Sequence, residues 1–201
     1  MIIFHKISWK NFLSTGNTPI TINLKEAPTT LIIGTNGSGK STLLDALCFV
    51  LFNKPFRIIK KDQMVNTINN ADTIVEVEFS IGPTMYKVRR GIKPNLFEIY
   101  KDGLLINQDA SSIDYQKVLE QQIMKLNYRS FCQVVILGSS SYEPFMKMRA
   151  SYRRDVIEEI LDIKVFGHMN LILRSKQIEL GKEVTNLRPV SYTHLTLPTK
   201  A

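Results

Sequence analysis

The sequence predicts an α/β fold in which a parallel core carries an antiparallel β subsheet. A β-branched apolar run, residues 30–33, leads through a glycine-rich loop into an apolar segment of helical length, residues 42–52. Residues 73–81 alternate apolar and polar side chains, and two further strand-like runs, residues 85–90 and 96–100, follow. From residue 166 onward, apolar residues recur every seven positions, which is the repeat of a coiled coil.

The composition is that of a soluble globular chain. At 201 residues, with 44% hydrophobic and 22% charged residues, one domain is expected. No apolar run of 18 residues and no secretion signal occur, so we expect a cytoplasmic protein without a membrane partner. The net charge of +8 suits an anionic partner, although many soluble domains are mildly basic. Cys48 and Cys132 lie in apolar runs and are expected to be core residues.

The chain opens with a predicted β-hairpin. Residues 2–12 roughly alternate apolar and polar side chains, residues 14–17 form a turn cluster, and residues 19–24 alternate again. The two alternating segments are expected to pair ahead of the strand at residues 30–33.

The loop at residues 34–41 fits the phosphate-binding pattern G-x-x-x-x-G-K-[ST]. Its glycines let backbone N–H groups turn inward around phosphates, and the following helix adds its positive N-terminus. Lys40 is expected to reach the β- and γ-phosphates, and the Ser41 hydroxyl to bind Mg²⁺. A strand before the loop and a helix after it favour nucleotide binding over a chance glycine turn.

Pro55 ends the predicted helix, and a basic stretch follows at residues 57–62. A solvated loop is favoured there over a nucleic-acid contact. The strand-like runs within residues 73–107, with the turn signal Asp102-Gly103, predict an antiparallel meander.

The second half of the chain is expected to begin with a helix from Ser111 to Lys125 and a buried strand at residues 130–138. Gln133 interrupts that strand. It is either a hydrogen-bonded core glutamine or a side chain that points into the nucleotide site.

Residues 149–163 predict a further helix, which completes a lobe at residues 1–163. Residues 164–187 predict the start of a coiled coil, with an amphipathic surface helix as the alternative. Residues 188–201 abandon the heptads and carry two prolines, so we interpret them as a non-native tail. The heptad positions are Phe166, Leu173, Leu180 and Leu187.

Hydrolysis at a phosphate loop normally needs a second, acidic strand, and the sequence offers no convincing candidate. Glu76 and Glu78 alternate with valines and are expected on the solvent face of a sheet, whereas Glu158 and Glu159 lie in a helical pattern. The chain is therefore expected to hold half of a catalytic site.

A set of short motifs occurs along the chain in a characteristic order. The motifs are Lys10-Asn11-Phe12, the loop at 34–41, Lys54-Pro55-Phe56-Arg57, Lys60-Lys61-Asp62, Lys93-Pro94-Asn95 and Val134-Val135-Ile136-Leu137-Gly138. This ordered set resembles the SbcC-type, SMC-like ATPases of double-strand-break repair. Within that family, residues 1–187 resemble above all the large subunits of the recombination endonucleases of T-even-like phages.

The resemblance implies the N-terminal lobe of a P-loop NTPase head of the ABC and SMC type. In the family, a long coiled coil with a zinc hook follows, and a C-terminal lobe of the same protein supplies the signature motif, the acidic strand and a switch histidine. The chain is therefore expected to be an N-terminal fragment that lacks turnover by itself.

The resemblance also implies roles for individual residues. Lys40 and Gln133 correspond to catalytic residues, and Gln133 to the Q-loop glutamine that reads Mg²⁺ and the γ-phosphate. Leu13 stands where many members carry a phosphate-contacting arginine, and Lys10 or Ser14 would be weak substitutes. The implied ATP contacts are Asn36, Gly37, Ser38, Gly39, Lys40, Ser41 and Thr42.

The implied mechanism is a dimer of heads that clamps double-stranded DNA on binding ATP, with a separate metal-dependent, SbcD-type nuclease subunit. DNA contacts would be made mostly to phosphates. Two other functions remain open: a transporter-type ABC ATPase lobe, and a chromosome-organising SMC-type clamp without a nuclease. The expected DNA contacts are Lys60, Lys61, Arg89, Arg90, Arg153 and Arg154.

Overall fold

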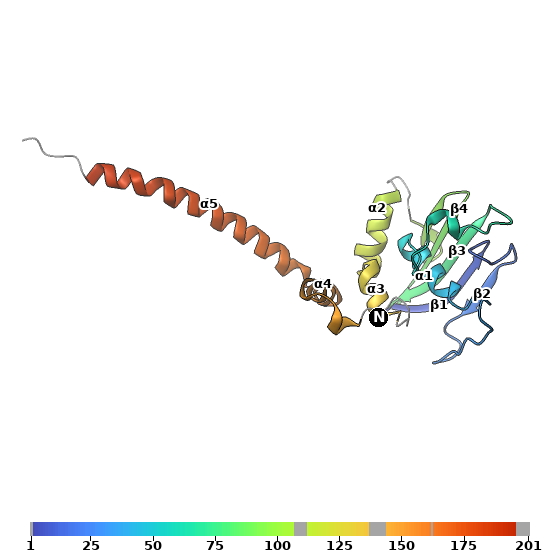
Figure 1. Ribbon diagram of the computed structural model, residues 1–201. Coiled ribbons are helices and arrows are strands. Elements are labelled where there is room, and N and C mark those ends of the chain that lie inside the picture. The colour runs from blue at the N-terminus through green and yellow to red at the C-terminus, as the bar shows by residue number, and fades with distance from the viewer. Residues whose placement is uncertain (1, 107–111, 137–143, 162, 196–201) are drawn as a thin grey trace, which may run out of the picture. The chain divides into compact units, whose positions relative to one another are not determined.

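The computed structural model describes residues 2–106, 112–136, 144–161 and 163–195 (Figure 1). The chain divides into two compact units, residues 1–153 and residues 154–201.

The first unit is built on a six-stranded antiparallel sheet with the order β2-β1-β3-β4-β5-β6. The predicted hairpin and meander are both confirmed, because β1 pairs with β2 and strands β3 to β6 pair in succession. The meander joins the hairpin through the pairing of β1 with β3. The strands are β1 (Ile2–Lys10), β2 (Ile20–Asn23), β3 (Thr73–Ile81), β4 (Thr84–Ile92), β5 (Leu96–Lys101) and β6 (Leu104–Leu105).

The two faces of this sheet differ in polarity because side chains alternate along each strand. The inner face carries the fully buried side chains of Val75, Val77, Phe79, Val88 and Ile99. The opposite face carries the ion pairs that Lys87 and Arg89 of β4 form with acids of β3 and β5. As predicted, Glu76 and Glu78 therefore lie on the face away from the core.

Helix α1 (Thr42–Phe52) has the predicted bounds and covers the inner face of the sheet (Figure 1). Every residue from Asp45 to Phe52 is buried, as expected of a helix that is apolar on all sides. The helix ends at Asn53, which adopts the left-handed conformation and donates its backbone N–H to the carbonyl of Phe49 at 2.8 Å.

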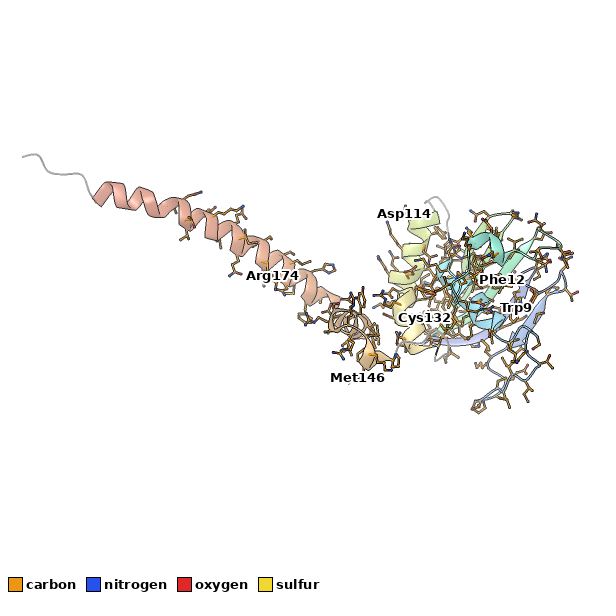
Figure 2. The ribbon with its side chains drawn as sticks, viewed as in Figure 1. Trp9, Phe12, Asp114, Cys132, Met146 and Arg174 are labelled. Carbon is orange, nitrogen blue, oxygen red and sulfur yellow. The ribbon has the colours of Figure 1, made fainter. Side chains whose placement is uncertain are left out.

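An aromatic cluster fills the space between the sheet and the helices, and Trp9 and Phe12 belong to this core (Figure 2). Phe12 packs on Phe49 of α1, with ring centroids 5.5 Å apart. Phe131 contacts both Phe4 of β1 and Phe52 of α1. Burial of these rings joins the first strand, the phosphate-loop helix and the later helices into one core.

The strand predicted at residues 130–138 is wrong, because residues 128–134 are helical. Asn127 caps this helix, α3, by accepting a hydrogen bond from Ser130 N at 2.9 Å. Gly138 and Ser111 lie outside the described residues. The helical segments after α1 in this unit are η1 (Lys61–Met64), α2 (Ser112–Lys117), the π-helix η2 (Val118–Met124), α3 (Tyr128–Val134) and η3 (Phe145–Lys147).

The strand predicted before the phosphate loop is also not formed. Residues 30–33 have no regular structure, and Leu31 and Ile33 expose 81% and 84% of their surface. A parallel strand needs neighbours on its edges, and the described part of the chain provides no parallel strand. The α/β class with an antiparallel subsheet is confirmed, but its expected parallel core is absent from the described residues.

Helix α4 (Ala150–Ile160) corresponds to the helix predicted at residues 149–163 and spans the boundary between the two units. The second unit continues as α5 (Lys164–Leu195). The heptad residues Phe166, Leu173, Leu180 and Leu187 expose between 59% and 65% of their surface. The sequence predicts the end of the coiled-coil helix at residue 187 and a non-native tail from residue 188. The α5 backbone stays helical through residue 195 and shows no break at this position. None of the helices in the described part combines the length and apolarity that crossing a bilayer requires.

Candidate nucleotide-binding site

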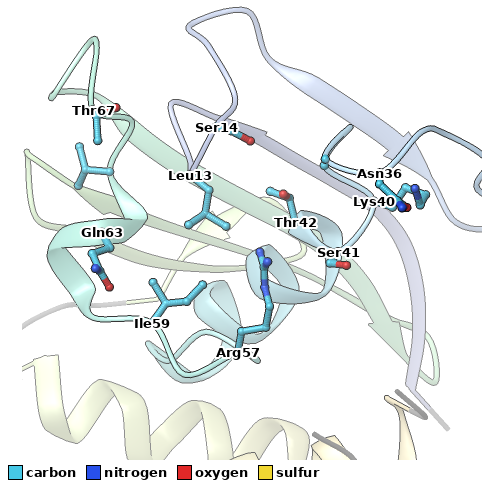
Figure 3. A pocket seen from close by; sticks show the side chains of 13 residues that line it. Leu13, Ser14, Asn36, Lys40, Ser41, Thr42, Arg57, Ile59, Gln63 and Thr67 are labelled. Atoms are coloured by element: carbon cyan, nitrogen blue, oxygen red, sulfur yellow. The ribbon is translucent and has the colours of Figure 1, made fainter. Parts of the chain in front are cut away.

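A cavity of about 530 Å³ opens between the phosphate loop, the turn after β1 and the segment that follows α1 (Figure 3). One end of the cavity is formed by the phosphate loop and the first residues of α1. The other end is formed by two separate segments, residues 13–14 and residues 59–67, and the Arg57 side chain lies between the two ends (Figure 3). The lining residues are Leu13, Ser14, Asn36, Gly37, Gly39, Lys40, Ser41, Thr42, Arg57, Ile59, Gln63, Val65 and Thr67.

The phosphate loop has the backbone that its glycines permit. Gly37 and Gly39 have φ values of 88° and 90°, a conformation that other residues rarely adopt. Two short-range hydrogen bonds close the loop: Ser38 N donates to Thr35 O at 3.2 Å, and Thr42 N donates to Gly39 O at 2.9 Å. Of the predicted phosphate contacts, all except Ser38 line the cavity.

The Lys40 ammonium is folded onto the loop. Its Nζ atom donates to the carbonyl oxygens of Gly34 at 2.6 Å and Thr35 at 2.8 Å. These bonds hold the ammonium group against the backbone at the start of the phosphate loop. A phosphate bound in the cavity would therefore meet a positive charge that is already held at the loop.

The N-terminus of α1 faces the same end of the cavity. Ser41 is the N-cap, makes no side-chain capping bond and is exposed. The first turn of a helix carries partial positive charge on N–H groups that have no partner within the helix. The exposed Ser41 hydroxyl is suited to bind a magnesium ion beside an anionic ligand at this end.

Arg57 is the site residue that sequence reasoning missed. Its backbone N–H donates to Asp45 Oδ1 at 2.9 Å, and its Nε donates to Asp45 Oδ2 at 2.7 Å. Asp45 is fully buried, whereas the Arg57 side chain keeps 44% of its surface exposed and lines the cavity (Figure 3). The available signal was the single acid, Asp45, inside an otherwise apolar helix.

The end of the cavity away from the phosphate loop is largely apolar. Leu13, Ile59 and Val65 supply hydrocarbon surface, and Thr67 also lines this end (Figure 3). Gln63 also lines this end, and its Oε1 accepts a hydrogen bond from Lys60 N at 3.1 Å. A planar, weakly polar group such as a nucleobase fits such a surface.

Gln133 does not line this cavity. It lies on α3, and no group of the described residues donates a hydrogen bond to its buried Oε1 atom. A buried amide oxygen without a donor is costly, so this atom is available to a ligand or a further protein group. Its role as the Q-loop glutamine stays a prediction. Within the described residues, no three His, Cys, Asp or Glu side chains lie close enough together to hold a metal ion.

Two of the six predicted DNA contacts are Lys60 and Lys61, which are exposed at the start of η1. In the sequence they lie between Ile59 and Gln63, which line the cavity. Arg89 is occupied by ion pairs with Glu76 and Glu98. Arg153 and Arg154 belong to different units, and Arg153 donates from Nη1 to Met146 O at 3.2 Å.

Arg90 is 5% exposed, and this placement argues against its predicted DNA contact. It donates from Nε to Val50 O at 3.0 Å and from Nη2 to Gln116 Oε1 at 2.6 Å, and it stacks on the ring of Phe97. Burial lowers the pKa of its guanidinium. The side chain therefore joins β4, α1 and α2 inside the core.

Residues 6–185 match the family described as AAA domain. The chain belongs to this family. The resemblance to SbcC-type ATPases is also confirmed. Exonuclease subunit 2 of Escherichia phage RB69 is 40% identical over 179 residues, 89% of this chain and 32% of its own length. Its counterpart in Enterobacteria phage T4 is 40% identical over 83% of this chain and 30% of its own length.

A cellular member of the same group is more distant. The DNA double-strand break repair Rad50 ATPase of Thermoplasma volcanium is 28% identical over 92% of this chain and 21% of its own length. The chain spans about a third of the length of the two phage relatives.

Solved structures support the fold of this family. The Smc head domain of Pyrococcus furiosus, bound to the C-terminal domain of ScpA, aligns with a TM-score of 0.58 over 96% of this chain and 49% of that chain, at 20% identity. An SMC ATPase studied for ATP-driven dimerization and DNA-stimulated activation aligns with a TM-score of 0.55 over 79% of this chain and 99% of that chain, at 21% identity. At these identities the likeness concerns the fold.

Proposed function

We propose that the chain is the ATP-binding half of an ATPase head in a DNA recombination and repair nuclease complex. The observation that carries this proposal is the cavity at the phosphate loop, in which Lys40, Ser41 and the start of α1 converge. The 40% identity to two phage proteins named exonuclease subunit 2 favours a nuclease complex over a transporter.

The cavity suggests how a nucleoside triphosphate would bind. Its phosphates would occupy the loop end, with Lys40 and the loop N–H groups as donors and Ser41 as a ligand of Mg²⁺. Arg57 would add a second cation, held in place by the buried Asp45. This arginine would compensate for Leu13, which stands at the position where the resemblance implies a phosphate-contacting arginine in many members of the family.

The proposed site is half of a catalytic centre. Leu31 and Ile33, directly before the loop, are more than four-fifths exposed and leave apolar surface uncovered. A C-terminal lobe of the same protein would cover this segment, pair with it as a strand and supply the missing acidic residues. The chain alone would then bind MgATP without steady turnover.

In the whole protein, two heads would close on two ATP molecules and clamp double-stranded DNA in the cytoplasm of an infected bacterium. A separate SbcD-type, metal-dependent nuclease subunit would cut the DNA. The exposed Lys60 and Lys61 lie close to the cavity and would contact DNA phosphates, so that binding would weaken as salt rises.

The proposal is tested with the Lys40→Ala variant of the full-length protein, assayed with its nuclease subunit on linear double-stranded DNA. The variant should lose ATP-stimulated DNA processing. A matched variant at the exposed Lys101, Lys101→Ala, should keep it. Processing by Lys40→Ala at the unaltered rate would refute the proposal.

A further inference from the structure

Two segments that are distant in the sequence meet at the apolar end of the cavity. The turn after β1 contributes Leu13 and Ser14, and the segment after η1 contributes Val65 and Thr67. Two backbone hydrogen bonds join them. Leu13 N donates to Met64 O at 2.7 Å, and Asn66 N donates to Asn11 O at 3.0 Å. The width of this end of the cavity therefore depends on how firmly the two segments are held together.

Asn66 is the side chain that spans both segments. It is 5% exposed. Its Oδ1 accepts from the backbone N–H groups of Ile68 at 2.9 Å and Asn69 at 3.0 Å, and its Nδ2 donates to Thr15 O at 2.9 Å. The Oδ1 atom thus stabilises the loop that contains Asn66, while the Nδ2 group holds the turn after β1.

Asn11 completes the connection from the other side. It is 2% exposed, and its φ of 51° lies in the left-handed region that asparagine tolerates. Its Oδ1 accepts from Asn69 Nδ2 at 2.7 Å, and its Nδ2 donates to Asn17 Oδ1 at 3.1 Å. Its backbone carbonyl accepts from Asn66 N at 3.0 Å and from Thr73 Oγ1 at 2.8 Å.

This network holds Leu13 in an unfavourable backbone conformation. Leu13 has a φ of 54°, in the left-handed region that is unfavourable for leucine and persists only where surrounding contacts impose it. The contacts are the Leu13 N–H bond to Met64 and the asparagine bonds on both sides of the turn. Leu13 is itself a wall of the cavity.

We propose that Asn66, assisted by Asn11, is a positioning residue for the nucleoside part of the bound nucleotide. This inference rests on the proposed nucleotide binding at the phosphate loop. Asn66 does not line the cavity, and it acts by holding Leu13 and Ser14 opposite Val65 and Thr67. The phosphate end is built from a different segment and does not depend on Asn66.

The test compares MgATP with magnesium tripolyphosphate, which has phosphates but no nucleoside. Binding of each to the whole chain is measured by isothermal titration calorimetry. Asn66→Asp keeps the shape and the acceptor but replaces the donor to Thr15 O with a second oxygen. We expect about tenfold weaker binding of MgATP, because a buried hydrogen bond is lost, and unchanged binding of tripolyphosphate.

Asn95→Asp is the matched control. Asn95 is exposed in the turn between β4 and β5, and the substitution changes the charge by the same amount as Asn66→Asp. It should leave both affinities unaltered. Equal weakening of both ligands by Asn66→Asp, or no weakening of either, would overturn the inference. If the unaltered chain binds neither ligand, the proposed function itself is wrong, and the two failures are thus distinguishable.

A second variant covers the possibility that circular dichroism shows Asn66→Asp to be unfolded. Asn69→Ala removes one hydrogen bond to Asn11 from an exposed position. It should weaken MgATP by a smaller factor and again spare tripolyphosphate. An unchanged ratio of the two affinities in this variant would also overturn the inference.

Discussion

Arg57 binds the buried carboxylate of Asp45 with both its backbone N–H and its guanidinium, at 2.9 and 2.7 Å. Asp45 belongs to the first turn of α1, and Arg57 belongs to the segment beyond the end of that helix. The pair therefore folds the segment back along α1 toward the phosphate loop. It also holds a partly exposed cation at the wall of the cavity.

Replacement of Asp45 should destabilise the lobe. Asp45→Ala leaves two donors of Arg57 without their acceptor in a site where the carboxylate was fully buried. The expected loss is about 2 kcal/mol in the free energy of unfolding, measured by urea denaturation. Asp45→Asn retains an oxygen for the Arg57 N–H and should lose less. Equal stability of Asp45→Ala and the unaltered chain would show that the pair contributes nothing.

Arg57 itself should affect affinity. Arg57→Ala removes a cation from the cavity wall, and we expect about tenfold weaker binding of both MgATP and magnesium tripolyphosphate. Arg57→Lys should recover part of this loss because it restores the charge without the planar guanidinium. Calorimetric titration measures both. If tripolyphosphate binds Arg57→Ala as it binds the unaltered chain, the side chain does not act on phosphates.

The phosphate loop leaves no room for a side chain at Gly34, and this can be tested by substitution. A Cβ atom at Gly34 would lie 2.5 Å from Ser38 Oγ, which is far inside van der Waals contact. Gly34→Ala should therefore weaken MgATP binding, and adding Ser38→Ala should restore part of it. Gly16→Ala is the control, because its added Cβ would meet no atom of the described residues within 4 Å, apart from those of its two chain neighbours. A double variant no better than Gly34→Ala would contradict this explanation.

The sequence predicted the parts of the site that depend on local chemistry. The loop glycines, Lys40, Ser41 and the bounds of α1 follow from a motif and an apolar run. The meander follows from alternation along β3 and β4. Prediction failed where distant partners decide the structure. Residues 30–33 have the composition of a strand but lack a neighbour in the described residues.

The region around Gln133 shows a second kind of failure. Its short apolar run suits a strand or a buried helix equally well, and the cap at Asn127 was the signal that favoured the helix. The Arg57–Asp45 pair and the asparagine network have no sequence spacing that would reveal them. Their members lie 12 and more than 50 residues apart and meet only because the core brings them together.

Arg90 should act on stability and leave DNA binding unaffected. Arg90→Ala removes two hydrogen bonds and a stacking contact from the core, so we expect a loss of about 3 kcal/mol in the free energy of unfolding. The exposed Arg154→Ala should change it by less than about 0.5 kcal/mol. A stable Arg90→Ala protein with weakened DNA affinity would restore Arg90 as a DNA contact.

The two cysteines should differ in reactivity. The hydrogen bond between the two thiols lowers the pKa of Cys132, and the same bond together with burial raises the pKa of Cys48. A lowered pKa keeps the Cys132 thiolate, the reactive form, populated at lower pH. Iodoacetamide labelling followed by mass spectrometry should therefore modify Cys132 first, and Cys48, which is buried, only at higher pH. Earlier labelling of Cys48 would contradict this ordering.

The most direct measurement is a calorimetric titration of MgATP into the whole chain and into its Lys40→Ala variant. Lys40 holds its ammonium over the carbonyls of Gly34 and Thr35, where the phosphates are proposed to bind. We predict one bound MgATP per unaltered chain and a loss of affinity of at least about a hundredfold in Lys40→Ala. Equal affinity of the two proteins, or no binding by the unaltered chain, would contradict the assignment of a nucleotide site to this lobe.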